Sequence, residues 1–301
     1  MGPLLPHGGG DPAGRWLVHR SPSRDGERVA VPRPGEAGAG VVSPGTSVPF
    51  DRAAEVYDQT RRLTAEASAA TTQLLRTELE PRQPCLEIGV GTGLIGLPLH
   101  RAGIRLIGVD LSAPMLAKLV EKAGGRPPFP LIIGDATRLP FADDVFGGAL
   151  ARHVLHLIPA WQGALRELIR VVRPDGVLLI NIGFSAGPWQ EIGDHLDALI
   201  GETARRVGLD VNRGAELDEA MAVFGARARE LPTVWQESEL TMEQYFGEVE
   251  ADVFSWTWNV PPDLLTDAVA ETKAWAAERF GDVDRVLEPR FASVWRAYDL
   301  P

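Results

Sequence analysis

Five short apolar runs rich in β-branched residues recur along the middle of the chain, and this rhythm restricts its fold more than any other feature. The runs are CLEIGV (85–90), RLIGVD (105–110), LIIGDA (131–136), VFGGALARH (145–153) and GVLLINIG (176–183). The segments between them have helical periodicity, most clearly AWQGALRELIRVV (160–172). Alternating strands and helices predict successive βαβ crossovers, and therefore an α/β fold with a doubly wound parallel sheet between two layers of helices. Continuous apolar strands agree with burial on both faces.

The segments on either side of this rhythm define the predicted domain organisation. Residues 1–47 contain seven prolines and ten glycines, and we expect a disordered tail there. A single domain is predicted over 48–301, opening with a helix that Asp51 caps and that continues to about residue 79. Helices over 191–208, ended by Gly208, and 216–225 are expected to form a helical lid (183–230). Strands at 232–240 and 290–298, with a helix over 262–280 between them, are expected to complete the sheet (231–301).

Composition and charge exclude several classes of function. The formal net charge of −11 disfavours nucleic acid and anionic membranes as partners, because both bind through neutralising Lys and Arg. The sequence has no run of eighteen apolar residues and no secretory signal at its start, so we expect a cytoplasmic protein that acts on a small molecule. The lone Cys85 lies in an apolar strand, which predicts a buried thiol. No Cys/His cluster has metal-ligand spacing, so no metal is predicted.

A glycine-rich turn follows the first apolar run, in the sequence CLEIGVGTGLIGL (85–97). In a doubly wound sheet this position lies at the crevice beyond the carboxyl ends of the strands, where ligands bind. Gly89 and Gly91 can adopt conformations closed to other residues and let a ligand approach the backbone. We expect the next helix to start near Thr92 with free N–H groups, which favour a polar or anionic ligand.

Acidic residues in or at the ends of the first three predicted strands further restrict which ligand could bind. Asp110 ends the second strand, where a carboxylate can accept both hydroxyl hydrogens of a ribose. Glu87, just before the turn, would repel a pyrophosphate but suits a ligand that carries an ammonium or sulfonium charge. Leu94 stands where the dinucleotide pattern G-x-G-x-x-G needs its last glycine. Asp135 ends the third strand, where it could accept from an adenine amino group while Ala136 offers a backbone N–H.

Five motifs, taken together and in their order along the chain, resemble those of the class I S-adenosylmethionine-dependent methyltransferases, close to the UbiE-like and type 11 branch. The motifs are LEIGVGTG, GVDLSAPML, GDATRLPFADDVFG, LARHVLHLI and RELIRVVRPDGVLLI. The resemblance covers about residues 50–183. It implies a Rossmann-like sheet of about seven strands in the order 3-2-1-4-5-7-6, with strand seven antiparallel, and S-adenosyl-L-methionine as cofactor.

The resemblance also implies roles for particular residues. They are Gly89, Val90 and Gly91 against the methionine part of the cofactor, Glu87 near its amino group, Asp110 on the ribose, Leu111 and Met115 beside the adenine, Asp135 and Ala136 at the adenine edge, and Tyr57 and Arg61 on a covering N-terminal helix, with Arg61 paired to the cofactor carboxylate. Arg152 follows the fourth strand and is included among the cofactor-binding candidates. His153 beside it is the candidate general base, because a histidine can take a proton near neutral pH.

The predicted function is therefore methyl transfer from S-adenosyl-L-methionine to a small-molecule acceptor by in-line displacement. Trp189, Trp256 and Trp258 are candidates for the wall of an apolar acceptor pocket, and core or lid packing is the alternative for each. Two other functions stay open. One is a nicotinamide-dependent oxidoreductase, which Leu94 and Glu87 disfavour, and the other is a cofactor-binding protein without catalysis.

Overall fold

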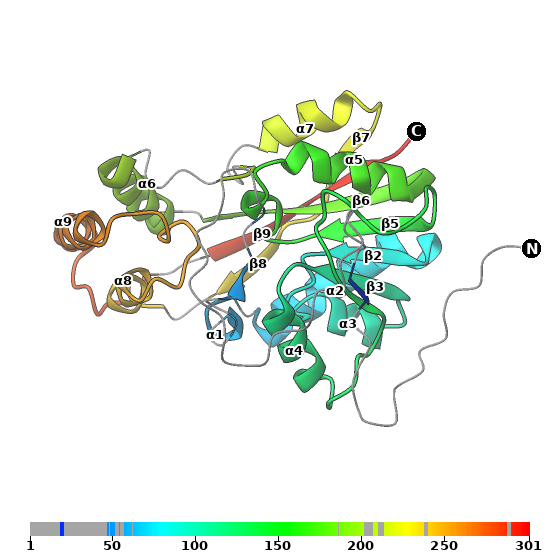
Figure 1. The fold of residues 1–301 in the computed structure, drawn as a ribbon. Helices are drawn as coiled ribbons and strands as arrows, with labels where there is room; N and C mark the ends of the chain where they lie inside the picture. Colours follow the sequence, from blue (N-terminus) through cyan, green and yellow to red (C-terminus); the bar gives the residue numbers. More distant parts are fainter. Residues whose placement is uncertain are drawn as a thin grey trace, which may run out of the picture.

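A nine-stranded sheet with helices on both faces forms the body of the computed structural model (Figure 1). The structure describes residues 19–20, 47, 49–51, 54, 57–61, 63–185, 187–201, 207–209, 214–237, 240–287 and 290–301. The strands are β1 (His19–Arg20), β2 (Cys85–Ile88), β3 (Leu106–Asp110), β4 (Leu131–Ile133), β5 (Phe146–Ala151), β6 (Val172–Ser185), β7 (Arg227–Glu230), β8 (Val234–Glu237) and β9 (Arg290–Asp299).

The strands follow the order β1-β4-β3-β2-β5-β6-β9-β7, and β8 also pairs with β9. Pairing is parallel from β4 to β6, and β9 is antiparallel to β6. The order β4-β3-β2-β5-β6-β9-β7 is the predicted 3-2-1-4-5-7-6, with the seventh strand antiparallel as expected. The predicted α/β doubly wound fold is therefore confirmed. Strand order reverses at β2, which places the loops after β2, β3 and β5 around one crevice.

Two apolar clusters hold the helices on the two faces of the sheet. On one face, Leu86 and Ile88 of β2 pack with α5 (Trp161–Val171) and α7 (Gly214–Ala222). On the other face, Cys85 packs with α2 (Ala65–Leu79), α3 (Gly96–Arg101) and α4 (Ala113–Lys122). Side chains alternate along a strand, so Glu87 lies on the same face as Cys85.

A third cluster forms a separate helical lobe of α6 (Pro188–Ile200), α8 (Met242–Glu250) and α9 (Pro262–Phe280). Figure 1 shows this lobe on the left, beyond one end of β6 and β9. The arrangement differs from the predicted lid, because α7 packs against the sheet and only α6 belongs to the lobe. The bounds of α9 match the predicted helix, but β7 and α8 were not predicted.

Three predicted details of the helices were wrong. The helix that Asp51 was expected to start is broken into α1 (Tyr57–Arg61) and α2, and Thr64 caps α2 by accepting from the backbone N–H of Ala67 at 3.1 Å. Asp51 instead accepts a hydrogen bond from the Ser112 hydroxyl. α6 ends at Ile200 with Gly201 as its C-cap at a φ of 56°. Gly208, the expected end of that helix, donates its N–H to the carbonyl of His156 instead.

Most of the predicted N-terminal tail, 1–18 and 21–46, lies outside the described residues. His19 and Arg20 form the short strand β1, which pairs in parallel with Ile132 and Ile133 of β4. In the part of the chain that the structure describes, no helix is both long and apolar enough to cross a membrane.

Candidate functional site

The glycine turn after β2 is an open loop whose backbone is fixed by the neighbouring strand. Gly89 and Gly91 have φ angles of 63° and 52°, in the left-handed region that favours glycine. The N–H of Gly91 donates to Asp110 Oδ2 at 2.7 Å. A Cβ on Gly89 would lie 2.6 Å from the Cβ of Val154, so a side chain has no room there. The loop continues to residue 95, because α3 begins at Gly96 and not near Thr92 as predicted.

The Asp110 carboxylate is held in a fixed orientation at the end of β3. Besides the bond from Gly91, its Oδ1 accepts from the N–H of Ser112 at 2.8 Å. Burial raises the pKa of Asp110, and hydrogen bonds from backbone N–H groups oppose that shift. Each oxygen keeps a further lone pair, so the carboxylate can still accept from two hydroxyl groups of a ligand.

Asp135 has a corresponding position after β4. Its Oδ1 accepts from the N–H of Thr137 at 2.9 Å and from the Thr137 hydroxyl at 2.8 Å. The hydroxyl of Ser47, from the N-terminal segment, lies 3.3 Å from both carboxylate oxygens. These long contacts are the weakest of the set, so a ligand amino group can replace Ser47 at low cost.

These loops enclose a cavity of about 60 Å³. Of the predicted site residues, its lining includes Tyr57, Gly89, Gly91, Asp110, Leu111, Met115, Asp135, Ala136 and His153. Ligand pockets commonly span about 300–1,000 Å³, so a nucleoside cofactor requires the covering segment to move. That segment was not predicted as part of the site and includes Ser47, Pro49 and Phe50. Phe50 closes the cavity by packing on Tyr57 and Trp258, with ring centroids 5.5 and 4.9 Å apart.

Four predicted site residues, Glu87, Val90, Arg61 and Arg152, lie outside this lining. The Val90 side chain is 3% exposed and packs in the core, where it excludes a side chain at Gly108. Only the backbone of Val90 is therefore available to a ligand.

Glu87 and Arg152 form a buried pair of charged groups behind the glycine turn. Glu87 is 2% and Arg152 9% exposed. Among the described residues, Glu87 Oε2 and Arg152 Nε have no hydrogen-bond partner, and the two side chains form no ion pair with each other. Burial raises the pKa of Glu87 and lowers that of Arg152, although the opposite charge of each partner partly offsets the shift. An acid and a base that are buried but unpaired cost stability unless a ligand satisfies them.

Tyr57 and His153 both line the cavity. Burial raises the pKa of the Tyr57 hydroxyl, and the positive charges of Arg152 and Arg61 oppose that shift. His153 follows β5 with a φ of 51°, which is uncommon for a residue other than glycine. Such strained positions cluster at functional sites, and this one directs the imidazole toward the cavity it lines.

The three candidate tryptophans have different surroundings. Trp258 packs on Phe50 and is thus connected to the cavity. Trp256 stacks on Phe254 with centroids 5.9 Å apart. Trp189 is 5% exposed and packs against Tyr245 in the core of the helical lobe. It therefore has the core packing that was the alternative to a place in the pocket wall.

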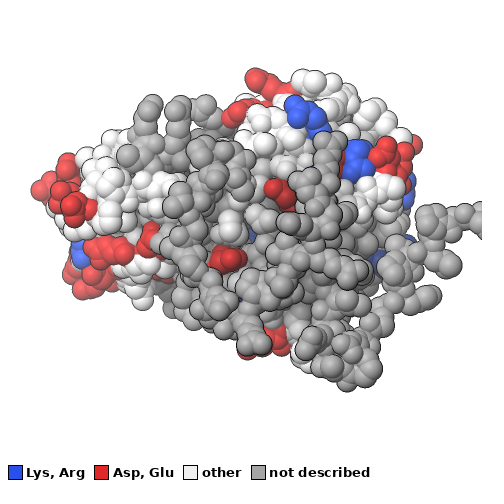
Figure 2. All heavy atoms as spheres, viewed as in Figure 1, with Lys and Arg blue, Asp and Glu red and all other residues white. Residues whose placement is uncertain are grey.

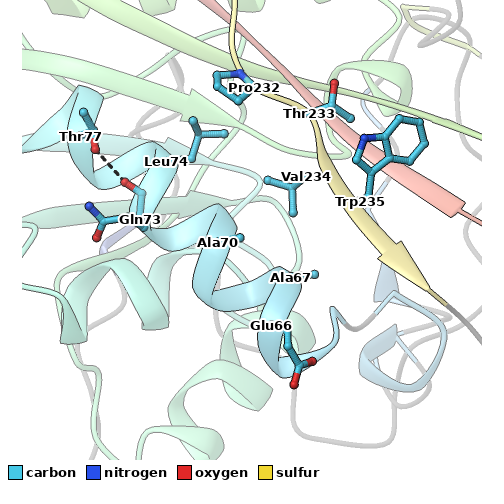
Figure 3. Close-up of a pocket in the computed structure, with 10 residues that line it drawn as sticks. All are labelled: Glu66, Ala67, Ala70, Gln73, Leu74, Thr77, Pro232, Thr233, Val234 and Trp235. Carbon is cyan, nitrogen blue, oxygen red and sulfur yellow. Dashed lines mark hydrogen bonds between the residues drawn. The ribbon is translucent and has the colours of Figure 1, made fainter.

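A larger and more open groove of about 550 Å³ lies between α2 and the segment leading into β8 (Figure 3). Its walls are Ala67, Ala70 and Leu74 on α2 and Val234 and Trp235 on the other side. None of the predicted site residues lines it. We therefore place the candidate site at the smaller cavity, where the glycine turn and the two aspartates converge.

Comparison with known proteins gives a family match for the middle of the chain. Residues 86–180 match the model of the methyltransferase domain family Methyltransf_11. The chain is 37% identical over 136 residues to the demethylmenaquinone methyltransferase of Mycobacterium tuberculosis H37Rv, a match that covers 44% of this chain and 55% of that protein. The chain thus spans about half the length of this curated relative.

Solved structures show the same fold. The YcgJ protein of Bacillus subtilis superposes with a TM-score of 0.54 at 18% identity, over 78% of this chain and 99% of that one. Phosphoethanolamine N-methyltransferase 2 of Haemonchus contortus, solved with phosphomonomethylethanolamine and S-adenosylhomocysteine, has a TM-score of 0.50 at 16% identity, over 83% of this chain and 57% of that one. The family match therefore covers residues 86–180, which hold the glycine turn and the strands around it, and the solved structures show the same fold.

Proposed function

We propose that this protein transfers a methyl group from S-adenosyl-L-methionine to a small-molecule acceptor. One observation carries the proposal. Glu87 Oε2 and Arg152 Nε are buried without a hydrogen-bond partner among the described residues, behind a glycine turn that also holds Asp110. An unpaired acid and base are complementary to the ammonium and carboxylate of an amino acid. The methionine part of the cofactor has both groups, and Asp110 is placed to accept from its ribose.

The remaining contacts of the cofactor follow from the cavity lining. Asp135 would accept from the adenine amino group in place of Ser47, with the Ala136 N–H beside it. Leu111 and Met115 would pack on the adenine. Gly89 and Gly91 leave the backbone open to the methionine part. These assignments extend the sequence predictions. In them, each buried polar group named here meets a cofactor group of opposite charge or opposite hydrogen-bonding type.

When bound, the cofactor supplies an electrophilic methyl group on a sulfonium, and the C–S bonding pair stays on sulfur as the acceptor lone pair forms the new bond. The protein's part is mainly to hold the two reactants in line and to exclude water, which can contribute about 7–11 kcal/mol in well-oriented systems. Phe50 and Tyr57 would exclude water by closing over the cavity. An acceptor hydroxyl or amine must also lose a proton, and His153 is placed to take it.

The acceptor is a small molecule in this proposal. The relative from M. tuberculosis is named for demethylmenaquinone, and the aromatic rings near the cavity would suit an acceptor that carries a ring system. Acidic side chains cover much of the described surface over α6, α8 and α9 (Figure 2), which disfavours a polyanion such as nucleic acid. The cytoplasmic location expected from the sequence stays a prediction.

Calorimetric titration with S-adenosylhomocysteine, the demethylated product, tests the proposal. We expect binding of the product and no binding of NAD. Arg152→Gln and Glu87→Gln should each weaken product binding tenfold or more, because each removes a charged hydrogen bond of about 1.5–3 kcal/mol. Arg76→Gln, on the exposed side of α2, is the matched control. Binding of NAD without binding of the product would refute the proposal and favour the oxidoreductase.

A cofactor-binding protein without catalysis is separated from an enzyme by turnover. Incubation of a cell extract with methyl-labelled cofactor and the purified protein should label a low-molecular-weight compound. Product binding in the absence of any labelled acceptor would favour the non-catalytic alternative.

A further inference from the structure

A second cation, the half-buried Arg61, lies near Tyr57 of the cavity lining and is not needed for the contacts above. It is one helical turn after Tyr57 in α1, on the same side of the helix. Its Nη1 donates a long hydrogen bond of 3.3 Å to the carbonyl of Thr60. Within the described ranges of the chain, no carboxylate forms an ion pair with it. A guanidinium has five N–H donors, so most of those of Arg61 remain available.

The electrostatic neighbours of the two arginines differ. Arg152 interacts with Tyr57 and with Glu87 behind the glycine turn. Arg61 interacts with Tyr57 and with the positive charge of Arg152, but also with Glu248 and Tyr245 of α8, in the helical lobe. The cofactor contains a single carboxylate, and Arg152 is the cation that lies with Glu87. Arg61 is therefore left for an anionic group on the other reactant.

Aromatic rings surround Arg61 on the side of the lobe. Its guanidinium carbon lies 4.5 Å from the centroid of the Phe254 ring, a distance typical of a cation–π contact. Trp256 stacks on Phe254, and Phe50 packs between Tyr57 and Trp258. We call these five rings, Phe50, Tyr57, Phe254, Trp256 and Trp258, the aromatic cluster. Two of its members, Phe50 and Tyr57, line the cavity, and Phe254 carries the contact with Arg61.

We propose that Arg61 binds an anionic group of the methyl acceptor while the aromatic cluster packs against its ring, so that the acceptor is a flat aromatic anion such as an aromatic carboxylate or a phenolate. This inference rests on the proposed function, because it assigns the second substrate of the same site. It departs from the sequence prediction, in which Arg61 pairs with the cofactor carboxylate.

The negative surface of the lobe does not oppose this assignment. The acidic side chains in Figure 2 are exposed to solvent, and salt screens their effect beyond about 8 Å. Arg61 acts at contact, and its guanidinium is half-buried against the Phe254 ring, where a charged hydrogen bond is stronger than in bulk water. The cluster therefore selects by the charge of the group that reaches Arg61.

Binding of three probes to the complex with S-adenosylhomocysteine tests the inference. The probes are 1-naphthoate, 1-naphthalenemethanol and 1-naphthylmethylammonium, which share a ring system and differ in charge. We expect the wild-type complex to bind naphthoate at least tenfold more tightly than the other two. Arg61→Gln should abolish this preference and leave the affinity for S-adenosylhomocysteine within twofold. Arg61→Lys should retain part of the preference, and Arg76→Gln should change nothing.

The possible failures are distinguishable. Wild-type protein that does not bind S-adenosylhomocysteine would overturn the proposed function and this inference with it. Normal product binding without preference for naphthoate would overturn the inference alone. Arg61→Gln that loses product affinity and keeps the naphthoate preference would return Arg61 to the cofactor carboxylate. The comparison of the three probes on wild-type protein requires no variant, so it holds even if Arg61→Gln folds poorly.

Discussion

Replacement of Glu87 by glutamine is expected to stabilise the protein without ligand and to weaken cofactor binding. Glu87 is 2% exposed, its carboxylate accepts no hydrogen bond from the described residues, and burial raises its pKa well above the ordinary value of 4.5. Because the pKa of Glu87 is raised in the folded state, its carboxyl lowers stability once the pH exceeds its pKa in the unfolded chain. Glutamine avoids that cost and keeps a similar shape.

The sign of the pH dependence follows from the raised pKa. Below the unfolded pKa, both states bind the proton and Glu87 costs no stability. As the pH rises above that value, only the unfolded state loses its proton, so the wild type loses stability by at most about 1.4 kcal/mol per pH unit until the folded pKa is reached. The Glu87→Gln protein lacks this loss. Its advantage over wild type should be small at pH 5 and increase toward pH 7.

Urea unfolding between pH 5 and pH 8, followed by circular dichroism, measures this difference. Glu219→Gln on the exposed side of α7 serves as the control, because its loss of charge does not involve burial. Calorimetry with S-adenosylhomocysteine on the same proteins should show at least a tenfold loss for Glu87→Gln. A Glu87→Gln protein that is less stable than wild type by the same amount at every pH would refute the reasoning, because the carboxylate would then support the fold.

Three further predictions concern the cavity. Asp110→Asn should weaken S-adenosylhomocysteine binding by about 10- to 100-fold in calorimetry with an unchanged circular dichroism spectrum, because the amide replaces one of the oxygens that accept; unchanged affinity would contradict the ribose assignment. Gly91→Ala should lower stability by about 1–2 kcal/mol in urea, because the residue has a φ of 52° and a Cβ would lie 3.1 Å from Met115 Cε; a fully stable variant would show that the loop adapts. Ser47→Ala should raise product affinity by up to about threefold, since it removes a weak competitor for Asp135, and weaker binding would show that Ser47 contacts the ligand.

The central sheet and its loop could be predicted from sequence because both depend on local patterns. Apolar strands alternate with amphipathic helices in the order in which the chain folds into crossovers, and the glycines follow the first of these strands. Asp110 and Asp135 end neighbouring strands, so strand order alone brings them to one edge. The helix over 262–280 was found with its bounds because a proline starts it and a glycine ends it.

Elements without such patterns were missed. β7 reads RARE, with no apolar face, and forms because β9 offers a pairing edge and because Arg229 pairs with Asp299 and Glu78. α8 did have a sequence signal in the capping box of Thr241 and Gln244. α6 packs in the lobe and α7 packs on the sheet because different apolar faces meet in the folded chain. An amphipathic pattern predicts that a helix has a buried face, but it does not predict which element that face packs against.

The sequence alone predicted the alternating strands and helices and the glycine turn, because these follow from periodicity and spacing along the chain, whereas the strand order was implied by the family resemblance. Only the tertiary structure decided that Glu87 and Arg152 are both buried with an atom that no described residue pairs with, that Phe50 packs on Trp258 at the cavity, and that Arg61 lies on Phe254. Each of these contacts joins residues far apart in the chain. Their energies depend on burial and distance, and neither quantity can be read from residue order.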